Sequence, residues 1–233
     1  MQIASVQSVP ADELAWITKA DMVEVDRVMI EDLHIELTQM MENAGRSLAR
    51  LVLEAAAPAR VGVAAGTGGN GGGGLVAARH LHNAGIEVIV VSARPQVEMT
   101  PVSAHQLDIL ERMGLARAAE MPDVDVVIDA VIGYSLRGAP RGSSEAVIRA
   151  IRGAKAVVSL DTPSGLDVTS GSAPGAVVTA DATMTLALPK VGLRNSPYVG
   201  ELYLADISVP PEVADTFGAD APSFGSHGLL RVV

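Results

Sequence analysis

The first sixty positions of the chain place apolar residues at helical spacing. Between Asp21 and Ile30 apolar side chains recur every three or four residues, and the same period continues from Leu37 to Ala57. We therefore expect an N-terminal helical arm over residues 12–57. Packing in a core or in a twofold interface explains its methionine-rich stripes better than a cofactor site does, and we expect the arm to form a homodimer interface. The stripes contain Met22, Val25, Val28 and Met29, and then Met40, Met41, Ala44, Leu48, Leu51 and Val52.

From Arg60 onward, short apolar runs alternate with helical segments. The β-rich run RVGVAA leads into a glycine tract and the helix-like segment LVAARHLHNAG, which ends at Gly85 before the next run, EVIVVSA, begins at Glu87. Strand, helix and strand in this order form a parallel βαβ unit. The alternation continues with a helix over 103–113, a strand that ends at Gly133, a helix over 144–152, a strand that ends at Asp161, and the runs ATMTLALP and ELYLADIS.

This alternation predicts an α/β fold, a three-layer α/β/α sandwich around a mostly parallel sheet. We expect a single domain over residues 1–233, in which the arm precedes a sheet core at 60–210. Up to residue 210, no stretch rich in Pro, Ser or Gly is long enough to separate two cores. Residues 211–233 are rich in Pro, Ser, Gly and Ala, and we expect them to form a tail over the surface.

Composition excludes several classes of function. The chain has 17 basic and 27 acidic residues and a net charge of −10, which disfavours nucleic acid as a partner. It has no cysteine, so disulfides and thiolate chemistry are excluded and the cytoplasm is the default compartment. Gly or charged residues interrupt every apolar stretch, and the N-terminus has no basic segment before an apolar block, so we expect no membrane attachment.

The glycine tract is the first candidate for ligand binding. Seven of the nine residues from Gly66 to Gly74 are glycine, and we expect a helix to begin near Gly72. Ligands of open parallel sheets bind beyond the carboxyl ends of the strands, where glycine lets backbone N–H groups approach an anion. A phosphate or pyrophosphate fits this arrangement. No Lys-Ser or Lys-Thr pair follows, so the tract is not a P-loop, and close packing of helix on sheet is the alternative explanation.

Two aspartates, Asp129 and Asp161, lie at the ends of neighbouring apolar strands. Carboxylates at such positions face the crevice and suit acid–base chemistry or a cation, whereas a cap or loop role is the alternative. Lys190 follows the fifth strand, and both a phosphate contact and a solvated position fit it. The acidic residue that binds ribose in NAD-dependent dehydrogenases is missing, because residues 92–94 are Ser, Ala and Arg.

Six segments, in this order, resemble the N-terminal YjeF domain family, whose enzymatic members are NAD(P)H-hydrate epimerases. They span about residues 20–210 and are ADMVEVDRVMIEDL, MMENAGR at 40–46, the glycine tract with LVAARHL, DAVIGYSLRGAPRG, DTPSGLDVTSG and LALPKVGL. The resemblance implies a Rossmann-like fold, commonly dimeric, and an isomerase that interconverts the R and S epimers of hydrated NADH and NADPH in metabolite repair. It also implies a separate NAD(P)H-hydrate dehydratase that completes the repair.

The resemblance assigns roles to particular residues. It implies a potassium ion held by Asn70, Asp129 and Ser164, and contact between Asp161 and the hydrated nucleotide. Because the reaction needs a proton donor and acceptor near the hydroxyl group, Asp161 is our candidate for the acid–base role. The implied substrate-binding residues are Gly69, Asn70, Gly71, Gly72 and Gly73 in the glycine tract, Gly133, Tyr134, Ser135, Leu136, Arg137 and Gly138 after the Asp129 strand, and Asp161.

The sequence departs from the family pattern at four positions. Gly69 and Gly73 replace an Asn and an Asp of the family's loop, and Tyr134 and Ser135 stand where Thr and Gly are usual. Backbone donors survive these changes, but side-chain contacts to the ligand are lost. Two alternatives therefore stay open: a catalytically weakened nucleotide-binding or scaffold domain, and an NAD-dependent oxidoreductase, which the missing ribose carboxylate disfavours.

Overall fold

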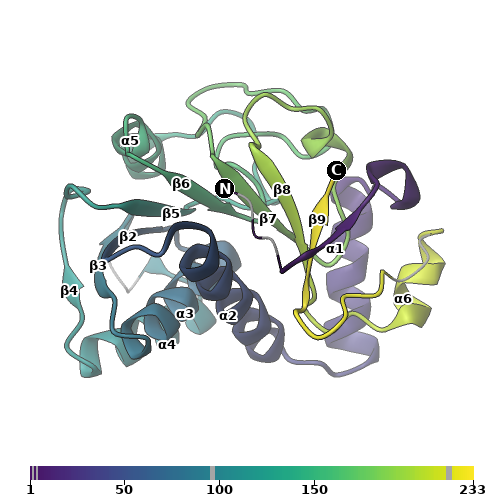
Figure 1. Ribbon diagram of the computed structural model, residues 1–233, viewed down its shortest axis with the longest axis horizontal. Helices are drawn as coiled ribbons and strands as arrows, with labels where there is room; N and C mark the ends of the chain where they lie inside the picture. Colours follow the sequence, from purple (N-terminus) through teal and green to yellow (C-terminus); the bar gives the residue numbers. More distant parts are fainter. Residues whose placement is uncertain (2, 4, 95–97, 219–221) are drawn as a thin grey trace.

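The computed structural model describes residues 1–233 except residues 2, 4, 95–97 and 219–221 (Figure 1). Its strands are β1 (Gln7–Val9), β2 (Arg60–Ala65), β3 (Glu87–Ser92), β4 (Ala116–Arg117), β5 (Val126–Ala130), β6 (Val157–Leu160), β7 (Ala182–Leu186), β8 (Glu201–Ala205) and β9 (Leu229–Val232). Its helices are η1 (Ala11–Glu13), α1 (Lys19–Arg27), the π-helix η2 (Val28–Asp32), α2 (Leu37–Ala56), α3 (Gly69–Asn83), α4 (Pro101–Arg112), α5 (Gly142–Ile151), η4 (Val191–Leu193) and α6 (Pro211–Thr216).

The strands of the described chain form one sheet in the order β1-β9-β8-β7-β6-β5-β2-β3-β4. Neighbouring strands are parallel except β8 and β9, which are antiparallel. The chain passes from β2 to β3 on one side and returns to β5 on the other, so the strand order reverses between β2 and β5. Ligands of such sheets bind at this reversal, beyond the carboxyl ends of the strands.

Helices cover both faces of the sheet (Figure 1). On one face α2, α3 and α4 bury side chains such as Leu48, Leu75 and Leu107 in one core, which also contains Val61 and Val63 of β2. On the other face Ile148 of α5 packs with Val127 of β5. Alternate residues of each strand serve the two cores, because successive side chains of a strand point to opposite faces. The predicted three-layer α/β/α sandwich with a mostly parallel sheet is confirmed.

The N-terminal helices do not form one arm. The prediction of an arm over 12–57 was wrong for α2, because its apolar face packs in the main core beside α3. Only α1 and η2 lie apart, at the end of the sheet near α6, where Met22, Val25 and Met29 share a smaller core with Val213. Figure 1 shows this group on the side of the molecule opposite β4.

The glycine tract is mostly helix rather than loop. We expected the helix near Gly72, but α3 begins at Gly69, so four buried glycines from Gly71 to Gly74 lie inside it. Glycine disfavours helix, yet tertiary contact overrides this preference here. A Cβ atom on Gly74 would lie 2.5 Å from Cβ of Ala130, and one on Gly72 would lie 2.6 Å from the Met41 side chain. The alternative explanation of the tract, close packing of helix on sheet, therefore holds for these residues.

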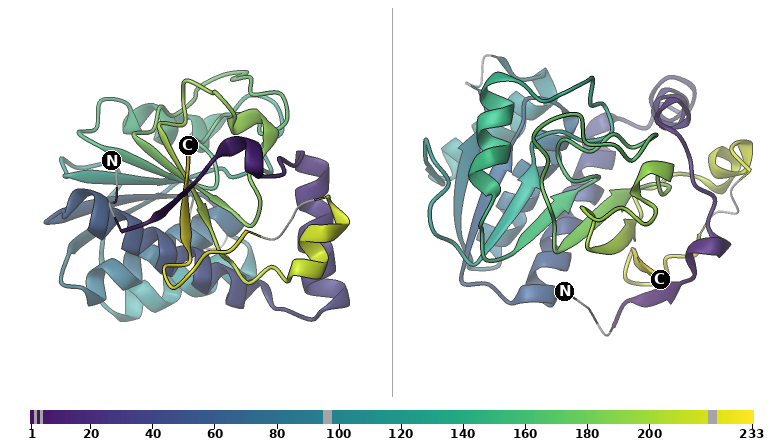
Figure 2. Two further views of the ribbon diagram at one scale, coloured as in Figure 1. Left: turned by 45° about the vertical axis from the view of Figure 1, so that its right-hand side comes forward. Right: turned by 90° about the horizontal axis from the view of Figure 1, so that it is seen from above.

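The last residues are part of the sheet, so the expected surface tail was wrong there. Residues 211–216 form α6, and Leu229 and Leu230 of β9 are buried between β1 and β8. Hydrogen bonding to two strands, which sequence pattern does not reveal, holds β9 in place, and Figure 2 shows β1 beside it.

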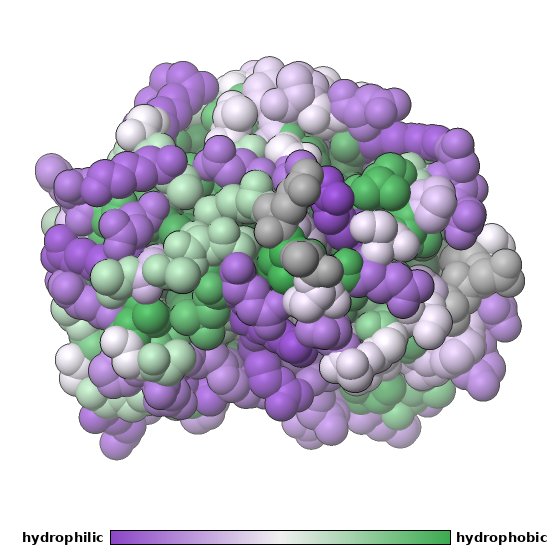
Figure 3. All heavy atoms as spheres, viewed as in Figure 1, coloured by the Kyte–Doolittle hydropathy of each residue, from purple (hydrophilic) through white to green (hydrophobic). Residues whose placement is uncertain are grey.

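On the face of the molecule that Figure 3 shows, hydrophilic residues lie along much of the edge. Within the described residues, no helix has the length and hydropathy needed to span a bilayer.

Gly74→Ala should destabilise the protein by about 1–3 kcal/mol, because the added methyl group overpacks the contact with Ala130. Gly69→Ala is the matched control in the same helix, since nothing lies within 4 Å of its Cβ position. Urea unfolding of both variants measures the difference. Equal midpoints for the two variants would show that the helix does not approach the sheet this closely.

Candidate active site

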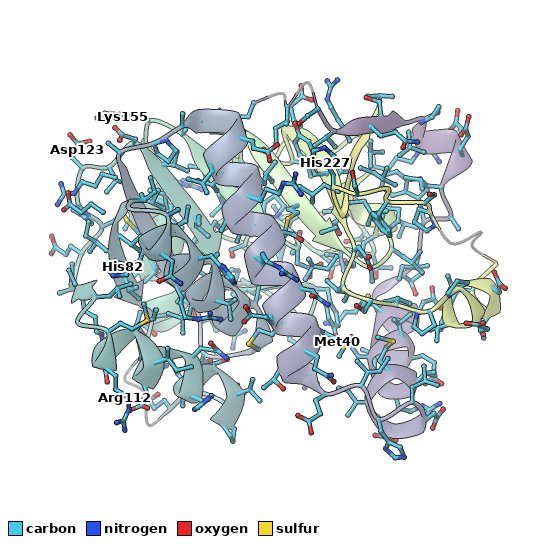
Figure 4. All side chains as sticks on the ribbon, turned by 60° about the horizontal axis from the view of Figure 1, so that its bottom comes forward. Met40, His82, Arg112, Asp123, Lys155 and His227 are labelled. Atoms are coloured by element: carbon cyan, nitrogen blue, oxygen red, sulfur yellow. The ribbon has the colours of Figure 1, made fainter. Side chains whose placement is uncertain are left out.

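A cavity of about 290 Å³ opens where the strand order reverses. Its walls come from α1, the first turns of α2, the N-terminus of α3, the loop after β5 and the end of β6. Met40 lies on the side of α2 that faces α1 (Figure 4). The lining residues are Met22, Asp26, Ile30, Leu37, Met40, Met41, Ala44, Gly69, Asn70, Gly73, Gly133, Tyr134, Ser135, Leu160, Asp161, Leu186 and Ile207. The walls are thus largely apolar, with a few polar groups on them.

Asp161 lies at the end of β6 and is almost fully buried, with 3% of its surface exposed. Its φ of 65° is left-handed, which a non-glycine residue adopts only when its surroundings hold it there. The Lys190 ammonium group, which has no exposed surface, lies 2.7 Å from Oδ1 of Asp161. Lys190 Nζ also donates to the Leu186 carbonyl at 2.7 Å and to Thr185 Oγ1 at 3.2 Å. The sequence left the role of Lys190 open between a phosphate contact and a solvated position, and the structure shows a buried partner of Asp161 instead.

Gly133 lets two polar side chains approach each other at the cavity. A Cβ atom on Gly133 would lie 3.0 Å from Oδ2 of Asp161 and 3.1 Å from the Asn70 amide. The next residue, Tyr134, donates its backbone N–H to Oδ2 of Asp161 at 2.8 Å. Asn70 comes from the first turn of α3, and its buried Nδ2 has no hydrogen-bond partner among the described residues. The loop after β5 therefore joins the Asp161 and Asn70 sides of the site.

Asp129 lies beneath this layer and is fully buried at the end of β5. Its carboxylate accepts hydrogen bonds from Ser164 Oγ at 2.5 Å, Ser164 N at 2.8 Å and Ser159 Oγ at 2.8 Å. Burial raises the pKa of the Asp129 carboxyl, and the hydrogen bonds from Ser164 and Ser159 lower it, with burial the larger effect. Ser164 Oγ also accepts the Ile132 N–H at 2.8 Å, so it links Asp129 to the loop that contains Gly133.

Sequence reasoning missed a second carboxyl group in the cavity, Asp26 of α1. The Tyr134 hydroxyl donates a short hydrogen bond to Asp26 Oδ2. Desolvation raises the pKa of Asp26, although the Tyr134 hydrogen bond and the charge of Lys190 lower it. Met22, Asp26 and Ile30 recur every four residues and all line the cavity. The sequence signal that could have identified Asp26 is an acidic residue within an apolar helical stripe.

The structure divides the expected substrate-binding residues into two groups. Gly69, Asn70, Gly73, Gly133, Tyr134, Ser135 and Asp161 line the cavity. The cavity lining does not include Gly71, Gly72, Leu136, Arg137 or Gly138. Gly71 and Gly72 are buried in α3, and Leu136 is buried with its carbonyl bonded to Lys19 Nζ at 2.6 Å. Arg137 and Gly138 are exposed.

A family model described as "YjeF-related protein N-terminus" matches residues 37–192. The chain belongs to this family. The YjeF N-terminal match includes Asn70, Asp129, Tyr134, Asp161 and Lys190, whereas α1 with Asp26 precedes it. The predicted family resemblance is therefore confirmed.

The names of two relatives of this chain refer to NAD(P)H hydrate. The NAD(P)H-hydrate epimerase of Dehalogenimonas lykanthroporepellens is 45% identical over 206 residues, which cover 84% of this chain and 83% of that protein. The bifunctional NAD(P)H-hydrate repair enzyme Nnr of Hyperthermus butylicus is 42% identical over 84% of this chain, but the match covers only 39% of that longer protein. The crystal structure of yeast ynu0 has the same fold, with a TM-score of 0.80 over 94% of this chain at 23% identity.

Proposed function

We propose that this protein is an NAD(P)H-hydrate epimerase, an isomerase that interconverts the R and S epimers of hydrated NADH and NADPH. The match to the Dehalogenimonas epimerase carries this conclusion, because it extends over most of both chains. A second named epimerase, from Truepera radiovictrix, is 41% identical over 81% of this chain and 89% of its own length. These relatives favour neither the scaffold nor the oxidoreductase alternative.

The reaction chemistry explains why a buried carboxylate in an apolar cavity is useful. The hydrated carbon is next to the ring nitrogen, so its hydroxyl group is part of a hemiaminal. Protonation lets the hydroxyl leave as water while the nitrogen lone pair forms an iminium, and water then adds to the other face. We assign Asp161 as an acid–base group for this exchange. The apolar walls formed by Met40, Met41 and Leu160 suit the apolar faces of the nicotinamide ring.

We further propose that the loop residues that line the cavity bind the nucleotide. Gly69 and Asn70 belong to the first turn of α3, whose leading N–H groups precede the first intrahelical bond, from Gly72 N to Gly68 O. Such groups bind anions such as a phosphate. Tyr134 and Ser135 would contact the nucleotide from the loop after β5. Leu136, Arg137 and Gly138 shape that loop from outside the cavity.

Potassium is the cofactor that we propose for Asn70, Asp129 and Ser164. The donor chemistry fits, since these residues offer amide, carboxylate and hydroxyl oxygens, and potassium binds oxygen ligands. The orphaned Asn70 amide supports the fit, because exchanging its oxygen and nitrogen would turn a carbonyl oxygen toward a place with no donor. A bound potassium ion would offset the buried charge of Asp129. No group of three or more His, Cys, Asp or Glu suited to a metal occurs among the described residues.

Potassium chloride should raise the melting temperature of the protein relative to choline chloride at the same ionic strength, and Asp129→Asn should reduce this difference. At ten times the dissociation constant, binding adds about 1.4 kcal/mol of stability. Differential scanning calorimetry measures the effect, with Asp125→Asn as the control variant. An equal potassium effect in parent and Asp129→Asn protein would remove Asp129 from the ligand set.

We place the enzyme in the cytoplasm. We also propose two partners for it. The first is an NAD(P)H-hydrate dehydratase, because the bifunctional relative combines hydrate repair activities in one longer chain. The second is another copy of this chain. Val23, Ile30, Leu33 and Leu37 are exposed apolar residues of the segment that runs from α1 to the start of α2, and a twofold contact there would cover them. Light scattering at micromolar concentration tests the dimer, and a strict monomer would contradict it.

A direct assay tests the proposed function. We would add the protein to an epimer mixture of hydrated NADPH with an epimer-specific dehydratase in excess, and follow conversion of the second epimer. The assay is run near neutral or higher pH, where spontaneous epimerisation is slow, with heat-inactivated protein as the control. We expect conversion well above background. A rate equal to background would favour the scaffold alternative.

A further inference from the structure

The cavity contains two carboxyl groups that come from different elements, Asp161 after β6 and Asp26 on α1. One residue contacts both of them. Tyr134 donates its backbone N–H to Asp161 and its phenolic hydroxyl to Asp26, so the two carboxyl groups lie at opposite ends of one tyrosine. The role given above to Asp161 leaves Asp26 without a function.

The two carboxyl groups have different surroundings. Asp161 accepts hydrogen bonds from the Lys190 ammonium and from the Tyr134 N–H. Asp26 has no ion pair with a basic side chain among the described contacts. Its pKa is raised, chiefly by burial and also by the charge of Asp161, against lowering effects of Tyr134 and Lys190. Carboxyl groups in such contrasting surroundings commonly divide the acid and base roles of a reaction.

Epimerisation at a hemiaminal carbon makes demands on both faces of the ring. On one face an acid gives a proton to the hydroxyl group, the C–O bond breaks with its electron pair on oxygen, and water leaves. On the other face water attacks the iminium carbon, and a base takes its proton as the C–N π bond returns to nitrogen. One proton is thus donated and one accepted, and in the reverse reaction the two groups exchange roles.

We propose that Asp26, hydrogen-bonded by Tyr134, is the second acid–base group of the epimerisation and acts on the ring face opposite Asp161. This inference rests on the proposed function. It identifies α1, which lies outside the matched family segment, as a contributor to the chemistry. Tyr134 is a positioning residue, because its hydroxyl holds the Asp26 carboxyl while its N–H holds Asp161.

Asp26→Asn tests the proposal first. We expect kcat to fall on the order of 10²- to 10⁴-fold in both directions, with KM little changed, because the amide keeps the shape but cannot transfer the proton. The control is Glu24→Gln, an exposed carboxylate on the same helix that pairs with Arg27, and it should retain the parent kcat. Circular dichroism and a thermal melt of both variants check folding.

Tyr134→Phe distinguishes an acid–base role of Asp26 from a purely structural role, because only the acid–base role predicts a shift of the pH–rate profile. Where Asp26 donates the proton, activity falls as pH rises through its pKa. The lost hydroxyl removes a hydrogen bond that lowers this pKa, so the alkaline limb of the pH–rate profile should move to higher pH. The same limb should be missing in Asp26→Asn. The charged and titratable groups that act on Asp26 are Tyr134, Lys190 and Asp161, and all three stay constant in the Glu24→Gln control.

The outcomes separate this proposal from the proposed function. A parent rate equal to background overturns both. An active parent whose kcat and pH profile are unchanged in Asp26→Asn and Tyr134→Phe overturns the second acid–base group alone. Loss of kcat in Asp26→Asn, together with an upward shift of the alkaline limb in Tyr134→Phe, supports it.

Discussion

Asp161→Asn is expected to lower epimerase turnover on the order of 10²- to 10⁴-fold, the usual contribution of an acid–base group. The asparagine can occupy the same place but cannot exchange a proton at the reacting hydroxyl group. The side-chain nitrogen of the asparagine would also replace one of the two carboxylate oxygens. It would then face either the Tyr134 N–H, which Oδ2 accepts in the parent, or the Lys190 ammonium, which Oδ1 accepts. The turnover number with hydrated NADPH, measured by dehydratase coupling, is the readout.

The same substitution should also destabilise the fold by about 3–5 kcal/mol, because it leaves the Lys190 ammonium buried without its counter-charge. Urea unfolding measures this loss. Asp167→Asn is the matched control in the same segment, since the Asp167 carboxylate bonds to the N–H groups of Thr169 and Ser170 outside the cavity. Parent-like turnover in folded Asp161→Asn would remove Asp161 from the chemistry.

Lys190→Met is expected to cost a similar amount of stability, about 3–5 kcal/mol, by leaving the buried Asp161 carboxylate unpaired. Methionine follows the path of the lysine chain but ends without charge, so the loss of the ion pair dominates the effect. The double variant with Asp161→Asn should be more stable than the two single losses predict, because neutral groups replace both charges at once.

Urea unfolding of the parent, the two single variants and the double variant completes a double-mutant cycle for this pair. The double variant should recover stability without recovering turnover, which separates folding from chemistry. Strictly additive losses would show that Lys190 and Asp161 act independently, contrary to their 2.7 Å contact.

Local pattern was enough to predict the central sheet. Strands β2, β3, β5 and β6 are mostly apolar, and glycine or polar residues separate them from the helices between them. Their order along the chain also predicts where ligands bind. Asn70, Gly133 and Asp161 follow such strands, and the structure brings them to one cavity.

Contacts between distant segments were not predictable in this way. The pairing of Gln7 with Leu230 has no local signal, and neither does the hydrogen bond from Tyr134 to Asp26. A lysine in a loop usually lies in solvent, so the burial of Lys190 follows only from its ion pair and from the backbone contacts of its loop with Ile17. The sequence placed the start of the helix near Gly72 rather than at Gly69, because tertiary packing selects glycine inside α3, where helix propensity disfavours it.

The position of β9 between β1 and β8 affects the order in which the strands fold during synthesis. β1 is an edge strand whose neighbour in the sheet is β9, so residues 7–9 have no strand to join until residues 229–232 have left the ribosome. Domains begin to fold from the N-terminal side as they emerge, and here the central strands can assemble early. Strand β1, although it precedes the central strands in the chain, is therefore among the last to dock.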